Sequence, residues 1–187
     1  NLDDEVNAHL FNHNWFSNTS LTTIDYVLEG GNIDSNGHGA VLCNYASVKH
    51  NARHSAIDKA ELEKSLQGWL HADHIHLIDI EGLQGDDTYG HIDTLCRFVD
   101  KNSIVYCASD NRHDPDYARL QSLSDQLKTL AQEFNYCLIP LPKPEFSDRS
   151  LPASYANFLI INDAVLVPQY GHSRDKDACR CLQNIYP

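Results

Sequence analysis

Residues 90–107 read GHIDTLCRFVDKNSIVYC, with two runs of apolar and β-branched residues on either side of a polar turn at 100–102. Such runs are typical of β-strands, and a short turn containing Asp and Asn between them is typical of a hairpin. We therefore expect strands over 90–99 and 103–107, paired through this turn.

A long amphipathic helix should follow this hairpin. Asp114 and Pro115 form a helix start signal, because a capping aspartate before a proline at the first helical position suits the free N–H groups there. Apolar residues then recur every three or four positions: Tyr117, Leu120, Leu123, Leu127, Leu130 and Phe134. A strand at 136–140 completes a unit of strand, turn, strand, helix and strand.

The same unit is expected twice more, once on each side. The first copy has a strand at 24–28, a Gly-rich turn at 30–39, a strand at 40–43, a helix at 58–70 and a strand at 74–78. The third copy has strands at 155–161 and 164–168 and a helix at 174–184. A repeated supersecondary unit predicts a propeller-like α/β array, which closes only with its full set of units. We expect 1–187 to be one incomplete domain.

The composition restricts the partners of this chain. Its formal net charge of −12 disfavours nucleic-acid binding, which needs clustered Lys and Arg, and is compatible with a small cationic ligand. The sequence contains no apolar run of the roughly 18 residues that a membrane span needs and does not start like a signal peptide, so we expect a cytoplasmic protein. The six cysteines lack the spacing of a metal site, and no metal is expected.

Three polar residues occupy similar places in successive units. Glu29, His91 and Asn157 are each assigned to the first strand of a unit, about one repeat length apart. If the units are arranged around an axis, these side chains converge at its centre. The alternative is that they only cap turns at strand ends.

The run GDDTYGHID at 85–93 is rich in groups that carry charge or move protons. Residues two apart on a strand share a face, so His91 and Asp93 should point into the same volume. An imidazole and a carboxylate suit acid/base chemistry beside a bound cation. A surface ion pair is one alternative, and a metal hydrolase using Asp86 as a further ligand is a poorer one, because no second well-spaced histidine accompanies it.

Four segments together carry a family resemblance: Leu28-Glu29-Gly30-Gly31-Asn32, GDDTYGHID, LPASYANF at 151–158 and VPQYG at 167–171. In this order and spacing, the chain resembles agmatine deiminases and the related bacterial peptidylarginine deiminases. The resemblance implies the pentein fold, a five-bladed αβ-propeller of ββαβ units, of which about three are expected here.

The resemblance also implies roles for particular residues. His91 would be the general acid/base, Glu29 would orient it, and Asp93 would bind the guanidinium nitrogens. Asn157 would contact the substrate, and Asp87 is a candidate for its far end. The family needs no metal or organic cofactor, so none is expected.

The family mechanism uses a cysteine thiolate, which the resemblance places in a Gly-rich segment ending in His-Cys. No such segment occurs before Pro187, so we expect this chain to lack the nucleophile. Cys96 should lie on the strand face opposite Asp93, and Cys107 has no general base beside it in sequence, so neither is expected to replace it.

The resemblance predicts a catalytic domain that hydrolyses agmatine to N-carbamoylputrescine and ammonia, in putrescine biosynthesis. A deiminase of free or peptidyl arginine is an alternative, as is an inactive pentein that binds a guanidinium ligand. Unpaired strand edges predict low solubility or assembly with another copy of the chain.

Overall fold

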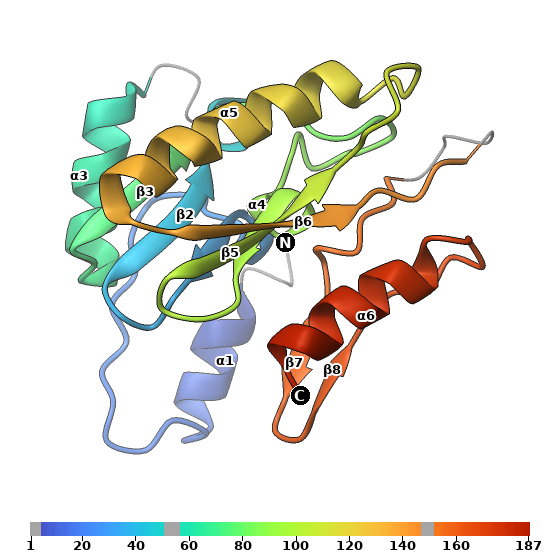
Figure 1. Cartoon of the computed structure of the whole chain (residues 1–187). Helices are drawn as coiled ribbons and strands as arrows, with labels where there is room; N and C mark the ends of the chain where they lie inside the picture. The colour runs from blue at the N-terminus through green and yellow to red at the C-terminus, as the bar shows by residue number, and fades with distance from the viewer. Residues whose placement is uncertain (1–4, 51–56, 147–151) are drawn as a thin grey trace.

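Three small β-sheets follow one another along the chain, each with helices beside it (Figure 1). The computed structural model describes residues 5–50, 57–146 and 152–187. Within that part, α1 (Val6–Asn12) precedes the three units, and the 3₁₀ turn η2 (Gly30–Asn32) opens the first of them. No helix among the described residues combines the length and apolar character needed to cross a bilayer.

The first unit contains a three-stranded sheet in the order β1-β2-β3. Its elements are β1 (Ile33–Ser35), β2 (Ala40–Asn44), α2 (Tyr45–His50), α3 (Lys59–Leu70) and β3 (His74–Ile78). β1 is antiparallel to β2, and β2 is parallel to β3. The connection between the parallel strands carries α3, which packs on β3 as a crossover helix does.

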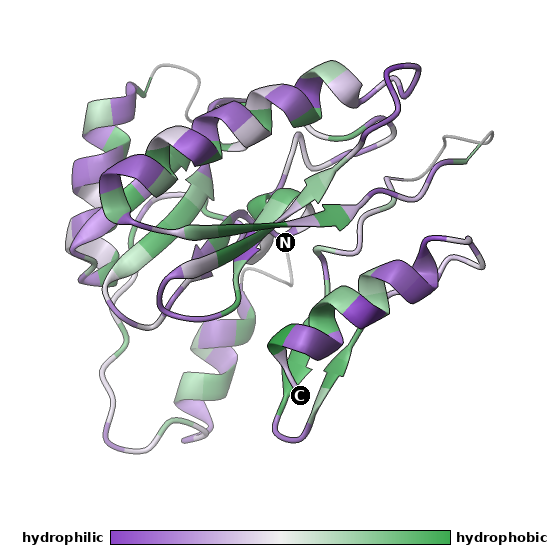
Figure 2. Ribbon diagram, viewed as in Figure 1, coloured by the Kyte–Doolittle hydropathy of each residue, from purple (hydrophilic) through white to green (hydrophobic). Residues whose placement is uncertain are grey.

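The second unit repeats this topology. Its elements are α4 (Ile92–Leu95), β4 (Cys96–Phe98), β5 (Ser103–Ala108), α5 (Tyr117–Phe134) and β6 (Cys137–Pro142). β4 is antiparallel to β5, and β5 is parallel to β6. Figure 2 shows β5 and β6 as mostly hydrophobic, whereas α5 alternates hydrophilic and hydrophobic residues. This is the pattern of a helix that covers one face of a buried sheet.

The third unit has the antiparallel pair β7 (Leu159–Ile161) and β8 (Ala164–Leu166), followed by α6 (Asp175–Ile185). The predicted strand–helix order therefore holds in all three units, and the α/β fold class is confirmed. Helix α3 begins as predicted, because the Asp58 carboxylate accepts a hydrogen bond of 2.8 Å from the Glu61 N–H. The strands predicted at 40–43, 74–78, 103–107 and 136–140 and the helix at 174–184 also match, with small differences at their ends.

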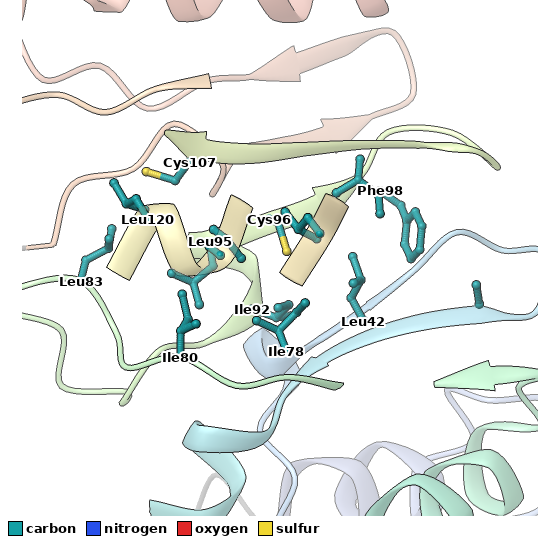
Figure 3. Packing of buried hydrophobic residues seen from close by; sticks show 14 residues of the cluster. Leu42, Ile78, Ile80, Leu83, Ile92, Leu95, Cys96, Phe98, Cys107 and Leu120 are labelled. Carbon is teal, nitrogen blue, oxygen red and sulfur yellow. The ribbon is translucent and has the colours of Figure 1, made fainter. Parts of the chain in front are cut away.

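The strand predicted at 90–99 is wrong in its first half. There the chain forms the short helix α4, and only Cys96–Phe98 pairs as a strand. Ile92 and Leu95 are both fully buried, and Ile92 lies beside Ile78 in the core (Figure 3). A strand would send residues three apart to opposite faces, whereas a helical turn places both on one face.

Two other predicted strands are displaced. Residues 24–28 are irregular, and the first strand is β1, inside the segment predicted as a turn at 30–39. In the third unit the strand is confined to Leu159–Ile161, because the preceding residues Tyr155, Ala156 and Phe158 are buried instead in a cluster with Leu182 of α6.

The start of α5 and the end of β8 also differ from prediction. α5 begins at Tyr117 rather than after Asp114, and β8 ends at Leu166 rather than at 168. The Asp114 carboxylate accepts the Asp116 N–H at 2.9 Å and holds Lys143 at 3.0 Å. Asp114 therefore closes a turn ahead of the helix instead of capping it.

Candidate active site

A carboxylate from the first unit meets an imidazole from the second. Glu29 Oε2 lies 2.8 Å from His91 Nε2, with the Glu29 side chain 57% exposed and the His91 side chain 15% exposed. A carboxylate at this distance can share a proton with the ring through a hydrogen bond and so orients it. The pair can therefore hold a proton at the edge of a largely buried ring.

The other ring nitrogen of His91 faces Gly31 and Asp93. A Cβ placed on Gly31 would lie 2.6 Å from His91 Nδ1 and 2.9 Å from Asp93 Oδ2. Both side chains therefore pack against the Cα of Gly31. Any other residue at position 31 would bring a Cβ into contact with them. The close approach of backbone and side chains is what requires glycine here.

His91 and Asp93 do not share a strand face, so that argument from sequence is wrong. His91 has an extended backbone (φ −52°, ψ 139°) directly before α4, and Asp93 lies within α4. Their side chains nevertheless come together, because both contact Gly31. Likewise, Glu29 and Asn157 lie outside the strands of the structure.

The charge balance at Asp93 suits a cationic partner. Partial burial raises the pKa of Asp93, while the positive charges of His91 and Arg97 oppose this rise. The neighbouring carboxylates of Asp34 and Asp86 raise the pKa further. A cation beside Asp93 would favour its ionised form, and the ionised form would in turn bind the cation.

Two buried asparagines join the chain segments that carry these groups. The Asn44 N–H donates to Asn32 Oδ1, and Asn32 Nδ2 donates to the Asn44 carbonyl, both at 3.0 Å. Asn44 Nδ2 also donates to the Gly90 carbonyl at 2.6 Å, and the Ile92 N–H donates to Asn32 Oδ1 at 3.3 Å. This amide pair fixes the 29–32 segment against the 90–92 segment.

Sequence reasoning missed the role of Asn44. Asn32 belongs to a motif quoted for the family resemblance, but Asn44 was not singled out. A usable signal existed, since Asn44 ends the apolar run Ala40-Val41-Leu42-Cys43, and a polar residue buried with a strand needs hydrogen-bond partners.

The other two candidate residues stand apart from this group. Asp87 and Asn157 are exposed, and neither side chain forms a hydrogen bond or ion pair with another described residue. The segment of Asn157 is nevertheless anchored, because Arg97 donates to the Phe158 carbonyl and its guanidinium lies 4.8 Å from the centre of the Phe158 ring. Leu151, which opens the LPASYANF motif, lies outside the described residues.

The buried cysteines are poorly suited to act as nucleophiles. Those that are buried are Cys43, Cys96 and Cys107. Burial raises the pKa of Cys43 and of Cys107 to about 12, and it raises the pKa of Cys96 as well. A thiol must ionise to attack, so these three would be unreactive near neutral pH. The more accessible Cys137, Cys179 and Cys181 belong to β6 and α6.

Known proteins with the same sequence pattern and fold are deiminases. The profile of the Porphyromonas-type peptidyl-arginine deiminase family matches residues 1–187. The agmatine deiminase of Pseudomonas aeruginosa is 27% identical over 88% of this chain and 51% of its own length. A structure of C. jejuni agmatine deiminase with substrate bound superposes with a TM-score of 0.89 at 34% identity, over 100% of this chain and 55% of that one. An Enterococcus faecalis agmatine deiminase gives a TM-score of 0.77 at 27% identity, over 88% of this chain and 51% of that one.

The chain belongs to the Porphyromonas-type peptidyl-arginine deiminase family. Its three units are units of the pentein αβ-propeller fold that its structural neighbours share, as the resemblance implied. The chain spans about half the length of the curated relatives it matches.

Proposed function

We propose that this chain carries part of the active site of a guanidine deiminase, which hydrolyses a C–N bond of a guanidinium group and releases ammonia. The main support for this proposal is that Glu29 and Asp93 both lie beside His91, in a chain that matches a deiminase family along its whole length. Two carboxylates around one imidazole provide both a cation-binding surface and a proton carrier.

In the proposed mechanism, Asp93 binds the guanidinium nitrogens and a thiolate attacks the guanidinium carbon. A carbon–sulfur bond forms, and the C–N bond breaks as His91 gives a proton to the departing ammonia. His91 then takes a proton from water, whose oxygen attacks the same carbon, and the carbon–sulfur bond breaks to release the ureido product and the thiolate. None of the six cysteines of this sequence is assigned as that thiolate.

We propose agmatine as the substrate, with N-carbamoylputrescine as the product, in putrescine biosynthesis in the cytoplasm. The support is that several relatives are named agmatine deiminases. Free or peptidyl arginine is the second candidate, because the family description names peptidyl arginine. These substrates share the guanidinium group that Asp93 would bind and differ at the far end, where exposed Asp87 is our candidate contact.

The test is ammonia release by the purified native protein with agmatine, arginine and a peptide containing arginine. We expect turnover of agmatine, with a loss of at least about 100-fold in His91→Gln and in Asp93→Asn, since each removes a group that acts on the reacting atoms. If peptidyl or free arginine is turned over faster than agmatine, that compound is the substrate instead of agmatine. Release that persists in His91→Gln would overturn the assigned role of His91.

An inactive guanidinium-binding pentein is the second candidate function, favoured by the burial of Cys43, Cys96 and Cys107. Calorimetric titration with agmatine separates the two candidates. Binding that depends on Asp93 but yields no ammonia would support this second function. Ammonia release would exclude it.

A further inference from the structure

Asp86 accepts three hydrogen bonds from the loop directly before His91. Its Oδ1 accepts the Thr88 N–H at 2.9 Å and the Thr88 hydroxyl at 2.6 Å, and its Oδ2 accepts the Gly90 N–H at 2.8 Å. A charged acceptor makes each of these bonds stronger than a neutral one would. Both oxygens of the carboxylate are therefore engaged within the loop, which argues against Asp86 as a metal ligand.

The loop has a backbone that needs such support. Tyr89 and Gly90 both have left-handed backbone angles, with φ of 58° and 92°. This conformation is costly for tyrosine, and residues held in it persist only when their surroundings compensate. The Tyr89 ring stacks on His50 with centroids 3.3 Å apart, and a Cβ on Gly90 would lie 2.7 Å from Asn44 Nδ2. The loop is thus held at both of these residues.

A continuous chain of hydrogen bonds leads from Asp86 to His91. The Thr88 hydroxyl donates to Asp86 and accepts the His91 N–H at 3.1 Å. At the other end of the His91 backbone, the Thr94 hydroxyl donates to the His91 carbonyl at 2.8 Å. The backbone of His91 is therefore fixed from both sides, and its extended conformation aims the ring at Glu29.

The position of the ring leaves little tolerance for movement. Its Nε2 must stay 2.8 Å from Glu29 while its Nδ1 packs over Gly31 beside Asp93. A shift of about 1 Å in a reacting group can reduce a rate by about 100-fold. Because Thr88 sits between Asp86 and the His91 backbone, a change at Asp86 should reach the ring without any contact between the two side chains.

We propose that Asp86 is a positioning residue of this site, which acts through Thr88 and Gly90 to hold the backbone of His91 and so places the imidazole between Glu29 and Asp93. The proposal rests on the proposed function for its kinetic consequences. It predicts that Asp86 controls turnover without contacting the substrate.

The test compares Asp86→Asn and Thr88→Val with two controls in the native protein. Asp86→Asn keeps the shape but loses the charge and one acceptor, and Thr88→Val removes only the linking hydroxyl. Thr88→Ser keeps that hydroxyl. Glu81→Gln removes a nearby negative charge from a side chain that is 82% exposed and pairs with Arg119 rather than with the loop. Imidazole ¹H–¹⁵N NMR, with the His91 signals identified by His91→Gln, is read together with kcat and KM.

We expect the His91 signals to move and kcat to fall about 10- to 100-fold in Asp86→Asn and Thr88→Val, with KM within about twofold. Thr88→Ser and Glu81→Gln should resemble the wild type.

Unchanged His91 signals and unchanged kcat in both test variants would overturn the proposal, as would a fall in melting temperature with normal kcat per folded molecule. If Asp86→Asn does not fold, Thr88→Val decides. If the wild type releases no ammonia from any guanidine, the proposed function fails, while the NMR comparison still tests the role of Asp86.

Discussion

His91 Nε2 lies 2.8 Å from Glu29 Oε2, although the two residues are 62 positions apart and belong to different units of the propeller. Neither residue lies in a strand, so the register of the sheets does not align them. The alignment comes from buried amides, since Asn32 follows Glu29 closely and hydrogen-bonds both to Asn44 and to the Ile92 N–H. Hydrogen bonds between the buried Asn32 side chain and backbone groups of both units therefore hold the site together.

Glu29→Gln tests the carboxylate of this pair. The amide can still contact the ring but no longer offers a charged acceptor that fixes its orientation, so we expect kcat to fall about 10- to 100-fold with little change in melting temperature. The steady-state rate of ammonia release between pH 6 and 9 is the measurement. Glu63→Gln, an exposed change on α3, is the control and should leave the rate unchanged. Equal rates for both variants would contradict a role for Glu29.

Asn44→Ala tests the buried amide link. It removes the side-chain amide that bonds the backbone of Ile80 and Gly90, and leaves those backbone atoms without partners beside a fully buried position, whereas the bonds between the Asn44 backbone and Asn32 can remain. We expect a loss of about 3 kcal/mol or more in the free energy of unfolding, measured by urea denaturation. Asn7→Ala, on the exposed face of α1, should change it by less than about 0.5 kcal/mol. A loss of similar size in both variants would contradict this prediction.

His76 makes the contact between the first two units sensitive to acid. It is 3% exposed on β3, and its Nε2 lies 2.8 Å from the Tyr136 hydroxyl. Burial, together with the charge of His74, lowers the pKa of His76 from 6.5 to about 4. The unfolded chain therefore binds a proton as pH falls from 6.5 towards 4 while the folded chain does not, and stability decreases through this window by at most about 1.4 kcal/mol per pH unit.

His76→Gln should make this pH dependence shallower. Glutamine can still hydrogen-bond Tyr136 but does not titrate, so the difference in unfolding free energy between pH 7 and pH 4.5 should be smaller than in the wild type. Urea denaturation at the two pH values gives this difference. His38→Gln, at an exposed histidine, is the control and should keep the wild-type slope. If His76→Gln shows the same difference between the two pH values as the wild type, then other groups cause the acid sensitivity.

The parts of the fold that could be predicted are those governed by local patterns. Helix α3 follows from the Asp58 cap and its apolar spacing, and β5 follows from its run of apolar and β-branched residues. The failure at 90–95 has a tertiary cause, because burial of both Ile92 and Leu95 selects a helical turn in a segment whose composition favours a strand. Local propensity does not contain that information.

The candidate site also has some residues that the sequence could predict and others that depend on the fold. The family resemblance pointed to Glu29, His91 and Asp93, and the structure brings these three together. The supporting roles of Asn44 and Asp86 depend on contacts with backbone groups whose positions follow only from the fold. Hydrogen bonds to the backbone are independent of the partner's side chain, so they leave little trace in the sequence of that partner.

Gly31 offers the sharpest test of the geometry, because its neighbour provides a matched control. A Cβ at Gly31 would lie 2.6 Å from His91 Nδ1 and 2.9 Å from Asp93 Oδ2, whereas a Cβ at Gly30 would meet no atom within 4 Å. Gly31→Ala must therefore displace both side chains. We expect a loss of about 100-fold in kcat/KM for ammonia release in Gly31→Ala and wild-type kinetics in Gly30→Ala.

The same pair of variants can be compared without turnover, through the imidazole NMR signals of His91. These should move in Gly31→Ala and stay in place in Gly30→Ala, because only the first substitution reaches the ring. Equal activity and equal His91 signals in both variants would show that His91 and Asp93 do not pack on Gly31. The convergence of these groups, on which the proposed chemistry depends, would then have to be abandoned.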